Sequence, residues 1–101
     1  MAMRPDDMTS EERSGFEREL LAATHHAMEG GQSGFGYQFR GAELTGEYPD
    51  TTITVRYWDP RYQRERSPSY RIWKELVWED GTLEHPAPRA AVLIKVWALG
   101  G

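Results

Sequence analysis

The stretch TSEERSGFERELLAATHHAMEGG, residues 9–31, decides how the fold begins. Thr9 followed three residues later by Glu12 is a capping box, the side-chain pattern that marks the first turn of a helix. Apolar residues then recur at spacings of three and four, which places them on one face of that helix. The glycine pair that begins at Gly30 stops the pattern. The sequence therefore predicts a helix over residues 10–29.

The chain changes to a period of two after this helix. Over residues 35–40 aromatic side chains alternate with small or polar ones, as in a half-buried strand. Gly41 puts the next apolar residue out of phase and predicts a bulge. A second alternating run covers residues 52–58, and a third, interrupted at Lys74, covers residues 70–78. These runs predict three consecutive strands.

Two features of the C-terminal third complete the predicted sheet. Asp80-Gly81 is the strongest hairpin signal of the chain, and a short returning arm over residues 82–84 follows it. Residues 90–99 are apolar on both faces, and their β-branched side chains favour a strand over a helix. We therefore expect an α+β fold, in which one N-terminal helix packs on an antiparallel meander of four to five strands. This α-β(4)-like two-layer domain covers residues 10–99, after a flexible tail over residues 1–9.

Composition excludes several classes of protein. The chain has 101 residues, a formal net charge of −4 and no cysteine, which excludes a disulfide framework, a thiolate nucleophile and cysteine-based metal sites. The N-terminal stretch MAMRPDDMTSEER is acidic and lacks the apolar core of a signal peptide. The longest apolar run, within residues 90–99, is too short to span a bilayer. We expect a cytoplasmic protein that does not enter membranes.

Large apolar side chains occupy both faces of the predicted third strand. Alternation places Trp73 and Val77 opposite Ile72, and residues 90–99 have the same two-sided character. One helix covers only one face of an antiparallel sheet, so the second face needs another cover. We therefore expect a homodimer that packs sheet to sheet. A strongly coiled sheet, or Trp rings that lie under arginine stems, is the alternative.

The stretch RYWDPRYQRERSPSYRIWK, residues 56–74, concentrates positive charge. Its six Lys and Arg against two acidic residues leave a balance of +4, so the other 82 residues sum to −8. If the strands that flank its loop pair with each other, the arginine and tryptophan residues of both strands share one face, with the loop arginines beyond them. The candidate binding residues are Arg56, Trp58, Arg61, Tyr62, Arg64, Arg66, Arg71 and Trp73.

Three interpretations fit this stretch. It is a solvated hairpin with no role beyond solubility, or a protein-binding surface, since Trp, Tyr and Arg dominate hot spots. It could instead bind single-stranded nucleic acid or a short anionic ligand by stacking and charge. The acidic remainder of the chain disfavours a long polyanion. Of the binding roles we predict recognition of a protein partner by a small non-catalytic protein, with the anionic ligand as the alternative.

A histidine-based enzyme is a further alternative. His25 and His85 each lie near a carboxylate in the sequence, Glu29 and Glu84, and either pair could form an acid–base site. His25 and His26 are adjacent, so a helix turns them about 100° apart and they cannot readily chelate one ion. The sequence therefore predicts no metal site and no cofactor, and it singles out no catalytic residue.

Overall fold

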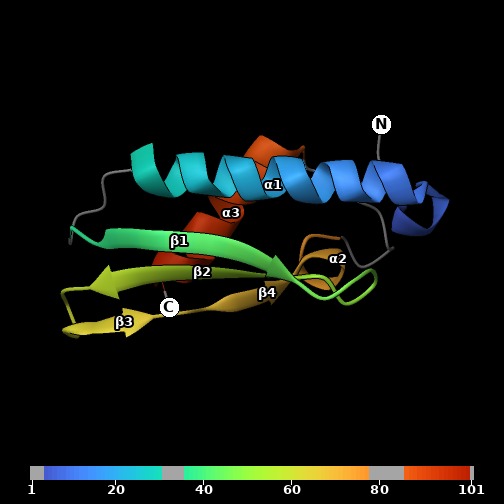
Figure 1. The fold of residues 1–101 in the computed structure, drawn as a ribbon. Helices are drawn as coiled ribbons and strands as arrows, with labels where there is room; N and C mark the ends of the chain where they lie inside the picture. The colour runs from blue at the N-terminus through green and yellow to red at the C-terminus, as the bar shows by residue number, and fades with distance from the viewer. Residues whose placement is uncertain (1–3, 31–35, 78–85, 101) are drawn as a thin grey trace.

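The computed structural model describes residues 4–30, 36–77 and 86–100 and shows an α+β fold (Figure 1). A long N-terminal helix packs on an antiparallel sheet of four strands, which confirms the predicted class, and a second long helix lies at the C-terminal end. In chain order the elements are η1 (Pro5–Asp7), α1 (Ser10–Gly30), β1 (Gln38–Thr45), β2 (Thr52–Asp59), β3 (Arg64–Arg66), β4 (Ser69–Arg71), α2 (Ile72–Glu75) and α3 (Ala87–Gly100).

Helix α1 begins at the predicted capping box. The Thr9 N–H donates to Glu12 Oε1 at 2.9 Å, and the Glu12 N–H donates to Thr9 Oγ1 at 3.1 Å. These reciprocal bonds satisfy two N–H groups that a helix start would otherwise leave without partners. Leu20, Thr24 and Met28 then form the buried face, at spacings of four. The predicted helix is confirmed.

The sheet is a meander with β2 at its centre (Figure 1). β1 pairs antiparallel with one edge of β2, while β3 and β4 pair one after the other with the opposite edge. The register of β1 shifts between Phe39 and Gly41, where Gly41 has a φ of +152°, so the predicted bulge is confirmed. The bulge brings Ala42 and Leu44 onto the same packed side as Phe39.

The predicted third strand ends early, at Arg71, and continues as the short helix α2. The Arg71 N–H donates to Glu75 Oε2 at 2.7 Å, and this carboxylate stabilises the first turn of α2. The buried residues Ile72, Trp73 and Leu76 are spaced as on one face of a helix. The predicted strand over residues 70–78 is therefore wrong beyond Arg71, because its apolar residues fit a helical period as well as an alternating one.

Residues 90–99 form most of helix α3, so the predicted C-terminal strand is wrong. The buried side of α3 is made of Ala87, Ala90, Ala91, Ile94 and Ala98, at helical spacings. Four of these five are alanines, whose small side chains allow close packing against α1. The β-branched valines that favoured a strand lie on the opposite, exposed side.

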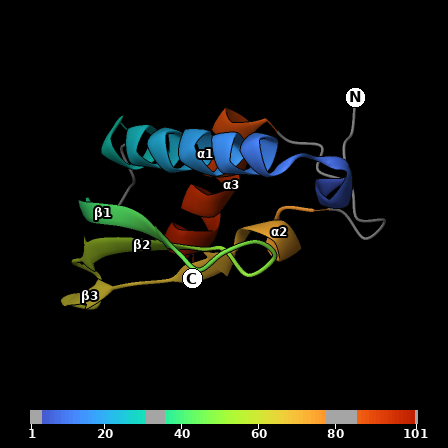
Figure 2. The same cartoon turned by 45° about the vertical axis from the view of Figure 1, so that its right-hand side comes forward.

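Both long helices lie on the same side of the sheet (Figures 1 and 2). α3 crosses behind α1 at a steep angle and reaches the sheet with its C-terminal end. The core fills the space between these helices, α2 and the inner face of β2. Its buried residues are Leu20, Met28, Ile53, Val55, Tyr57, Ile72, Trp73, Leu76, Ala87, Ala90, Ala91, Ile94 and Ala98.

The outer face of the sheet is polar, and no helix of the described residues covers it (Figure 1). Its β2 positions are Thr52, Thr54, Arg56 and Trp58, of which only Trp58 is a large apolar residue. Of the other tryptophans behind the dimer prediction, Trp73 is buried in the core, and the Trp97 ring of α3 lies 5.6 Å from the Tyr70 ring of β4. The apolar second face that motivated a sheet-to-sheet dimer is therefore not present among the described residues.

Residues 4–9 contact the rest of the domain. Pro5 is buried in η1, and Arg13 Nη1 donates to the carbonyls of Pro5 and Met8 at 2.9 and 2.7 Å. The predicted Asp80-Gly81 hairpin and its returning arm lie outside the described residues. No helix within residues 4–30, 36–77 and 86–100 has the length and apolar character needed to cross a bilayer.

Candidate functional site

The structure does not bring the eight predicted binding residues together on one surface. Arg56 and Trp58 occupy the outer, uncovered face of β2. Arg71 pairs with Thr52 on the same face, at the opposite end of β2, and forms an ion pair with Asp50. Of the remaining residues, Trp73 lies in the core. The others lie in the turn after β2 or in β3: Arg61, Tyr62, Arg64 and Arg66.

Trp73 is a core residue, only 7% exposed. Its indole Nε1–H donates to Glu17 Oε2 on α1 at 2.7 Å. Its ring lies 5.4 Å from the Phe16 ring and 5.7 Å from the Tyr48 ring, centroid to centroid. The expectation that Trp73 shares a face with Trp58 is therefore wrong, because the chain turns into a helix at Ile72.

The turn between β2 and β3 is built around Asp59, whose side chain is fully buried. The Arg61 guanidinium donates to both carboxylate oxygens, from Nε to Oδ1 at 3.1 Å and from Nη2 to Oδ2 at 3.0 Å. The backbone N–H of Arg61 also donates to Oδ1, at 2.9 Å. Arg66 Nη1 lies 3.5 Å from Oδ2. Hydrogen bonds from Arg61 hold the pKa of Asp59 below its ordinary value, against the opposing effect of burial. Asp59 is therefore an ionised anchor for two arginines.

Two hydrogen bonds attach this turn and β2 to the end of α3. Arg61 Nη2 donates to the Leu99 carbonyl at 2.9 Å, and the Tyr57 hydroxyl donates to the Ala98 carbonyl at 2.6 Å. The last carbonyls of a helix lack intrahelical partners, so these donors satisfy groups that would otherwise need water. Burial raises the pKa of Tyr57, which keeps the phenol protonated as a donor.

Tyr62 projects from this turn and is 58% exposed. The guanidinium carbons of Arg61, Arg64 and Arg66 lie 5.5, 5.8 and 5.6 Å from its ring centroid, within the range of cation–π attraction. We call residues 59–66 the Tyr62 turn. It presents one aromatic ring held among three arginines, two of which are fixed by Asp59.

Internal ion pairs use much of the positive charge that the arginine-rich stretch carries. Arg61, Arg66 and Arg71 each pair with an aspartate. Arg56 and Arg64 form no ion pair with any carboxylate of the described residues. The two arginines lie on different sides of the sheet. Arg64 is the strand partner of Asp59, which faces the helices, whereas Arg56 lies on the outer face of β2. The local balance of +4 is therefore not one continuous basic patch.

The outer face around Trp58 is the second part of the predicted site. Trp58 pairs with Gln38 of β1 and Glu65 of β3, so it lies at the middle of three strands. Arg40 and Glu65 form an ion pair at 3.2 Å that spans β2. The half-buried indole is thus surrounded by polar side chains that already pair with one another.

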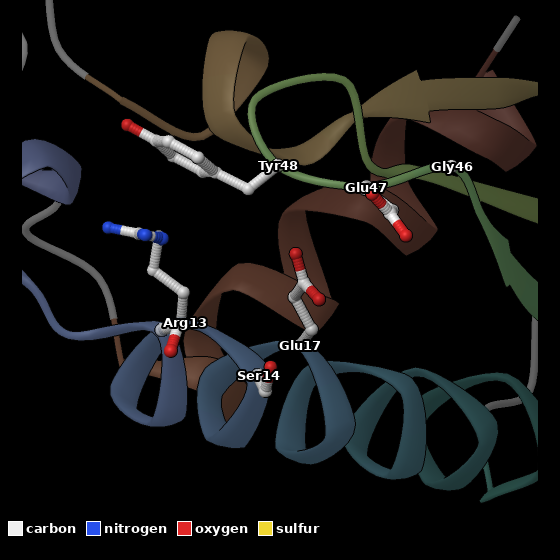
Figure 3. Close-up of a pocket in the computed structure, with 7 residues that line it drawn as sticks. Arg13, Ser14, Glu17, Gly46, Glu47 and Tyr48 are labelled. Atoms are coloured by element: carbon white, nitrogen blue, oxygen red, sulfur yellow. The ribbon is translucent and has the colours of Figure 1, made fainter.

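A groove of about 360 Å³ lies between α1 and the turn that joins β1 to β2 (Figure 3). The Glu17 side chain extends from α1 and the Glu47 side chain from the opposite wall, and the Arg13 guanidinium lies beside the Tyr48 ring (Figure 3). Its lining residues are Ser10, Arg13, Ser14, Glu17, Gly46, Glu47 and Tyr48.

The principal polar groups of this groove serve internal contacts. The Arg13 guanidinium binds the carbonyls of the N-terminal segment and stacks on Tyr48, 3.9 Å from the ring centroid. The Tyr48 hydroxyl donates to Asp6, and this bond raises the pKa of Tyr48. Glu17 accepts the Trp73 indole N–H. The side chains that line the groove therefore connect residues 4–8, α1 and α2.

The histidines give no support to an acid–base site in the described residues. His25 Nε2 lies 3.2 Å from the Ala42 carbonyl, and its ring packs edge-on against Phe39 at 5.3 Å. This contact attaches α1 to β1. No group of three His, Asp or Glu within the described ranges could hold a metal ion, and His85 lies outside them.

The sequence did not reveal the anchoring role of Asp59, which directly follows the predicted strand over residues 52–58. A signal was present, because Asp59 is followed by a proline and then by Arg61, and an aspartate side chain commonly binds the backbone N–H two residues on. The contact with the end of α3 had no comparable signal, since it depends on a helix that the sequence did not predict.

Comparison with protein-family models, with curated proteins and with solved structures finds no match to this chain.

Proposed function

We propose that this chain is a small, non-catalytic, cytoplasmic protein that recognises an acidic segment of a protein partner through the Tyr62 turn. The observation that supports it most is Tyr62 itself, a ring more than half exposed and held among three guanidinium groups. The cytoplasmic location is part of this proposal and rests on the lack of cysteine in the sequence.

Residue type and rigidity both support a binding role for this turn. Tyr and Arg are among the residue types that contribute most to protein interfaces. Arg61 is held by Asp59 and by the Leu99 carbonyl, so little side-chain freedom remains to be lost when a partner binds. Arg64 adds a guanidinium with no carboxylate partner in the described part of the chain, and this group can pair with an acidic residue.

The charge distribution favours a protein partner over a nucleic acid. Nucleic-acid affinity grows with the number of phosphates that free Lys and Arg neutralise. Three arginines of the stretch already pair with two aspartates, Asp59 and Asp50, and the chain as a whole carries −4. A short acidic segment needs only a few cations together with an aromatic contact, which is what the Tyr62 turn offers.

Peptide selection tests this proposal. Random-sequence peptides displayed on phage are selected on the immobilised full chain, and an enriched peptide is synthesised with a fluorescent label for anisotropy titration. We expect enriched peptides to be rich in Asp and Glu. Arg64→Glu should weaken binding by about tenfold or more, since a pairing cation becomes a repelling anion.

The matched control is Arg56→Glu, which makes the same charge change on the outer face of the sheet. At 0.15 M salt the Debye length of about 8 Å screens a distant charge, so Arg56→Glu should change affinity by less than about twofold. If only Arg56→Glu reduced the peptide affinity, the binding site would lie on the outer face that carries Trp58. Equal affinities for wild type and Arg64→Glu would contradict the proposal. Tight binding of a deoxythymidine oligomer with a steep salt dependence would favour the nucleic-acid alternative.

Self-association through the sheet stays a prediction. The outer face offers Trp58 and a row of Thr side chains, with the Arg40–Glu65 ion pair across it, so its character is polar. Obligate dimers usually bury more apolar surface than such a face provides. Light scattering after size exclusion measures the mass directly, and a monomer at micromolar concentration contradicts the prediction.

A further inference from the structure

The exposed side of α3 carries apolar and basic residues only. Val92 and Val96 are 52% and 59% exposed and lie one helical turn apart. Arg89 precedes Val92 by three residues and so shares this face, opposite the buried Ile94. Among the described residues only three large apolar side chains are strongly exposed, and these two valines are two of them.

The third of these side chains is Tyr62, and a hydrogen bond links its turn to α3. Arg61 donates to the Leu99 carbonyl at 2.9 Å, which holds the Tyr62 turn against the last turn of α3. Val96 precedes Leu99 by three residues, so the exposed side of α3 ends within about one helical turn of the carbonyl that Arg61 binds. We call Tyr62, Arg64, Arg89, Val92 and Val96 the α3–turn surface.

Charge complementarity identifies what this surface fits. α3 contains Arg89 and Lys95 and no acidic residue. Neither of them forms an ion pair within the described ranges, and the same holds for Arg64 at the turn. In a chain of net charge −4, an exposed apolar ridge with cations along it and at one end selects an acidic partner.

The shape of the ridge identifies the form of that partner. The backbone groups of α3 bond within the helix, so a partner strand has no free edge to pair with. Side chains one turn apart on a helix pack into the groove of a second helix. Val92 and Val96 are separated by about 6 Å along the axis, at 1.5 Å per residue, which matches two apolar side chains one turn apart on such a partner.

We propose that the α3–turn surface binds an amphipathic helix of a protein partner. Its apolar face packs on Val92 and Val96, and its acidic residues pair with Arg89 and with Arg64 beside Tyr62. This inference rests on the proposed function, because it assigns the Tyr62 turn to one end of a longer binding surface. The inference adds two features to that function: a second part of the binding surface, on the exposed side of α3, and the helical form of the ligand.

The test uses the selected peptide and variants on the exposed side of α3. Val92→Thr with Val96→Thr keeps the size and branching of both side chains and adds no charge, and both sites are exposed, so the fold should be retained. We expect this double variant to weaken the peptide about tenfold, and Arg89→Glu to weaken it severalfold. Thr54→Val, a change at a single polar position of the outer sheet face, is the control and should leave affinity unchanged.

Two further measurements report on the ligand. Circular dichroism of the complex, minus that of the free chain, should show that the peptide gains helix on binding. Amide shifts of the ¹⁵N-labelled chain should change along α3 and in the Tyr62 turn, while those of the outer face of β1 stay in place.

The outcomes separate the two proposals. If Arg64→Glu abolishes binding while the valine variant and Arg89→Glu bind as wild type does, the proposed function stands and this inference is overturned. A bound peptide without helical signal also overturns it. If Arg64→Glu has no effect, the proposed function itself fails. A dimer of the free chain that Val92→Thr with Val96→Thr dissociates would show that a second copy covers the ridge, which contradicts the acidic partner.

Discussion

Trp73 and Tyr62 belong to one arginine-rich stretch, yet the fold uses them in opposite ways. Trp73 is 7% exposed, donates to Glu17 and packs between α1 and the β1–β2 turn. Tyr62 is 58% exposed, and its ring lies among the guanidinium groups of Arg61, Arg64 and Arg66. The residue types are those of a binding surface in both cases. The difference is that the Trp73 ring packs against other core residues, whereas the Tyr62 ring projects from the surface.

The same division holds for the arginines. Arg61 and Arg66 neutralise the buried Asp59, whereas Arg64 has no carboxylate partner in the described residues. A cluster of Arg, Tyr and Trp in a sequence therefore contains a structural part and an available part. The two parts are distinguished only by the ion pairs and the side-chain exposure in the folded structure. Substitutions at Trp73, Asp59 and Tyr62 test this division.

Replacing Trp73 with alanine should have the largest effect. The change removes a buried ring and leaves a cavity between α1, α2 and the β1–β2 turn, and such changes cost about 3–5 kcal/mol. Thermal or urea unfolding followed by circular dichroism measures the loss. Trp73→Phe is the matched control, because it keeps a ring near Phe16 and Tyr48. It removes the donor to Glu17, worth about 1 kcal/mol, and part of the buried ring volume, so it should cost less than Trp73→Ala. A small effect of Trp73→Ala would mean that Trp73 is not the core residue described above.

Asp59→Asn should destabilise the chain in a pH-dependent way. The pKa of Asp59 is lowered in the folded state, so the folded chain binds this proton less readily than the unfolded chain does. The stability from the ionised carboxylate is therefore present above the unfolded pKa of about 3.9 and is lost as the pH falls through the lower, folded value. The gap in melting temperature between wild type and Asp59→Asn should be widest above about pH 5 and should close in stronger acid.

The control for this experiment is Asp50→Asn, which removes the same charge from the exposed pair with Arg71. Exposed pairs contribute little, so its melting temperature should stay near that of wild type across the same pH range. If the gap for Asp59→Asn stayed constant down to strong acid, the ionised carboxylate would not be the anchor of the Tyr62 turn.

The parts of the fold that depend on local sequence could be predicted. The capping box at Thr9, the alternation along β2 and the bulge at Gly41 each depend on neighbouring residues, and each is confirmed. α3 could not be recognised in the same way. Its two valines favour a strand, whereas its alanines favour a helix and also form the side that packs against α1. Tertiary packing decided the outcome.

The candidate site was predictable in composition but not in arrangement. The sequence identified the arginines and aromatics, and strand alternation placed Arg56 and Trp58 correctly on one face. It could not show that Arg71 pairs with Asp50, or that the chain becomes a helix at Ile72 and takes Trp73 into the core. Ion pairs between residues distant in sequence depend on the completed fold, so alternation alone overstated the continuity of the patch.

Tyr62→Ala should have the smallest effect on stability and a large effect on binding. The ring is mostly exposed, and the arginines around it keep their contacts with Asp59 without it, so the free energy of unfolding should change by less than about 0.5 kcal/mol. Affinity for the selected acidic peptide should fall by about tenfold, since an aromatic anchor is removed. Tyr62→Phe keeps the ring and should retain most of the affinity. If Tyr62→Ala unfolded the chain as readily as Trp73→Ala, both aromatics would be structural, and the division between them would not exist.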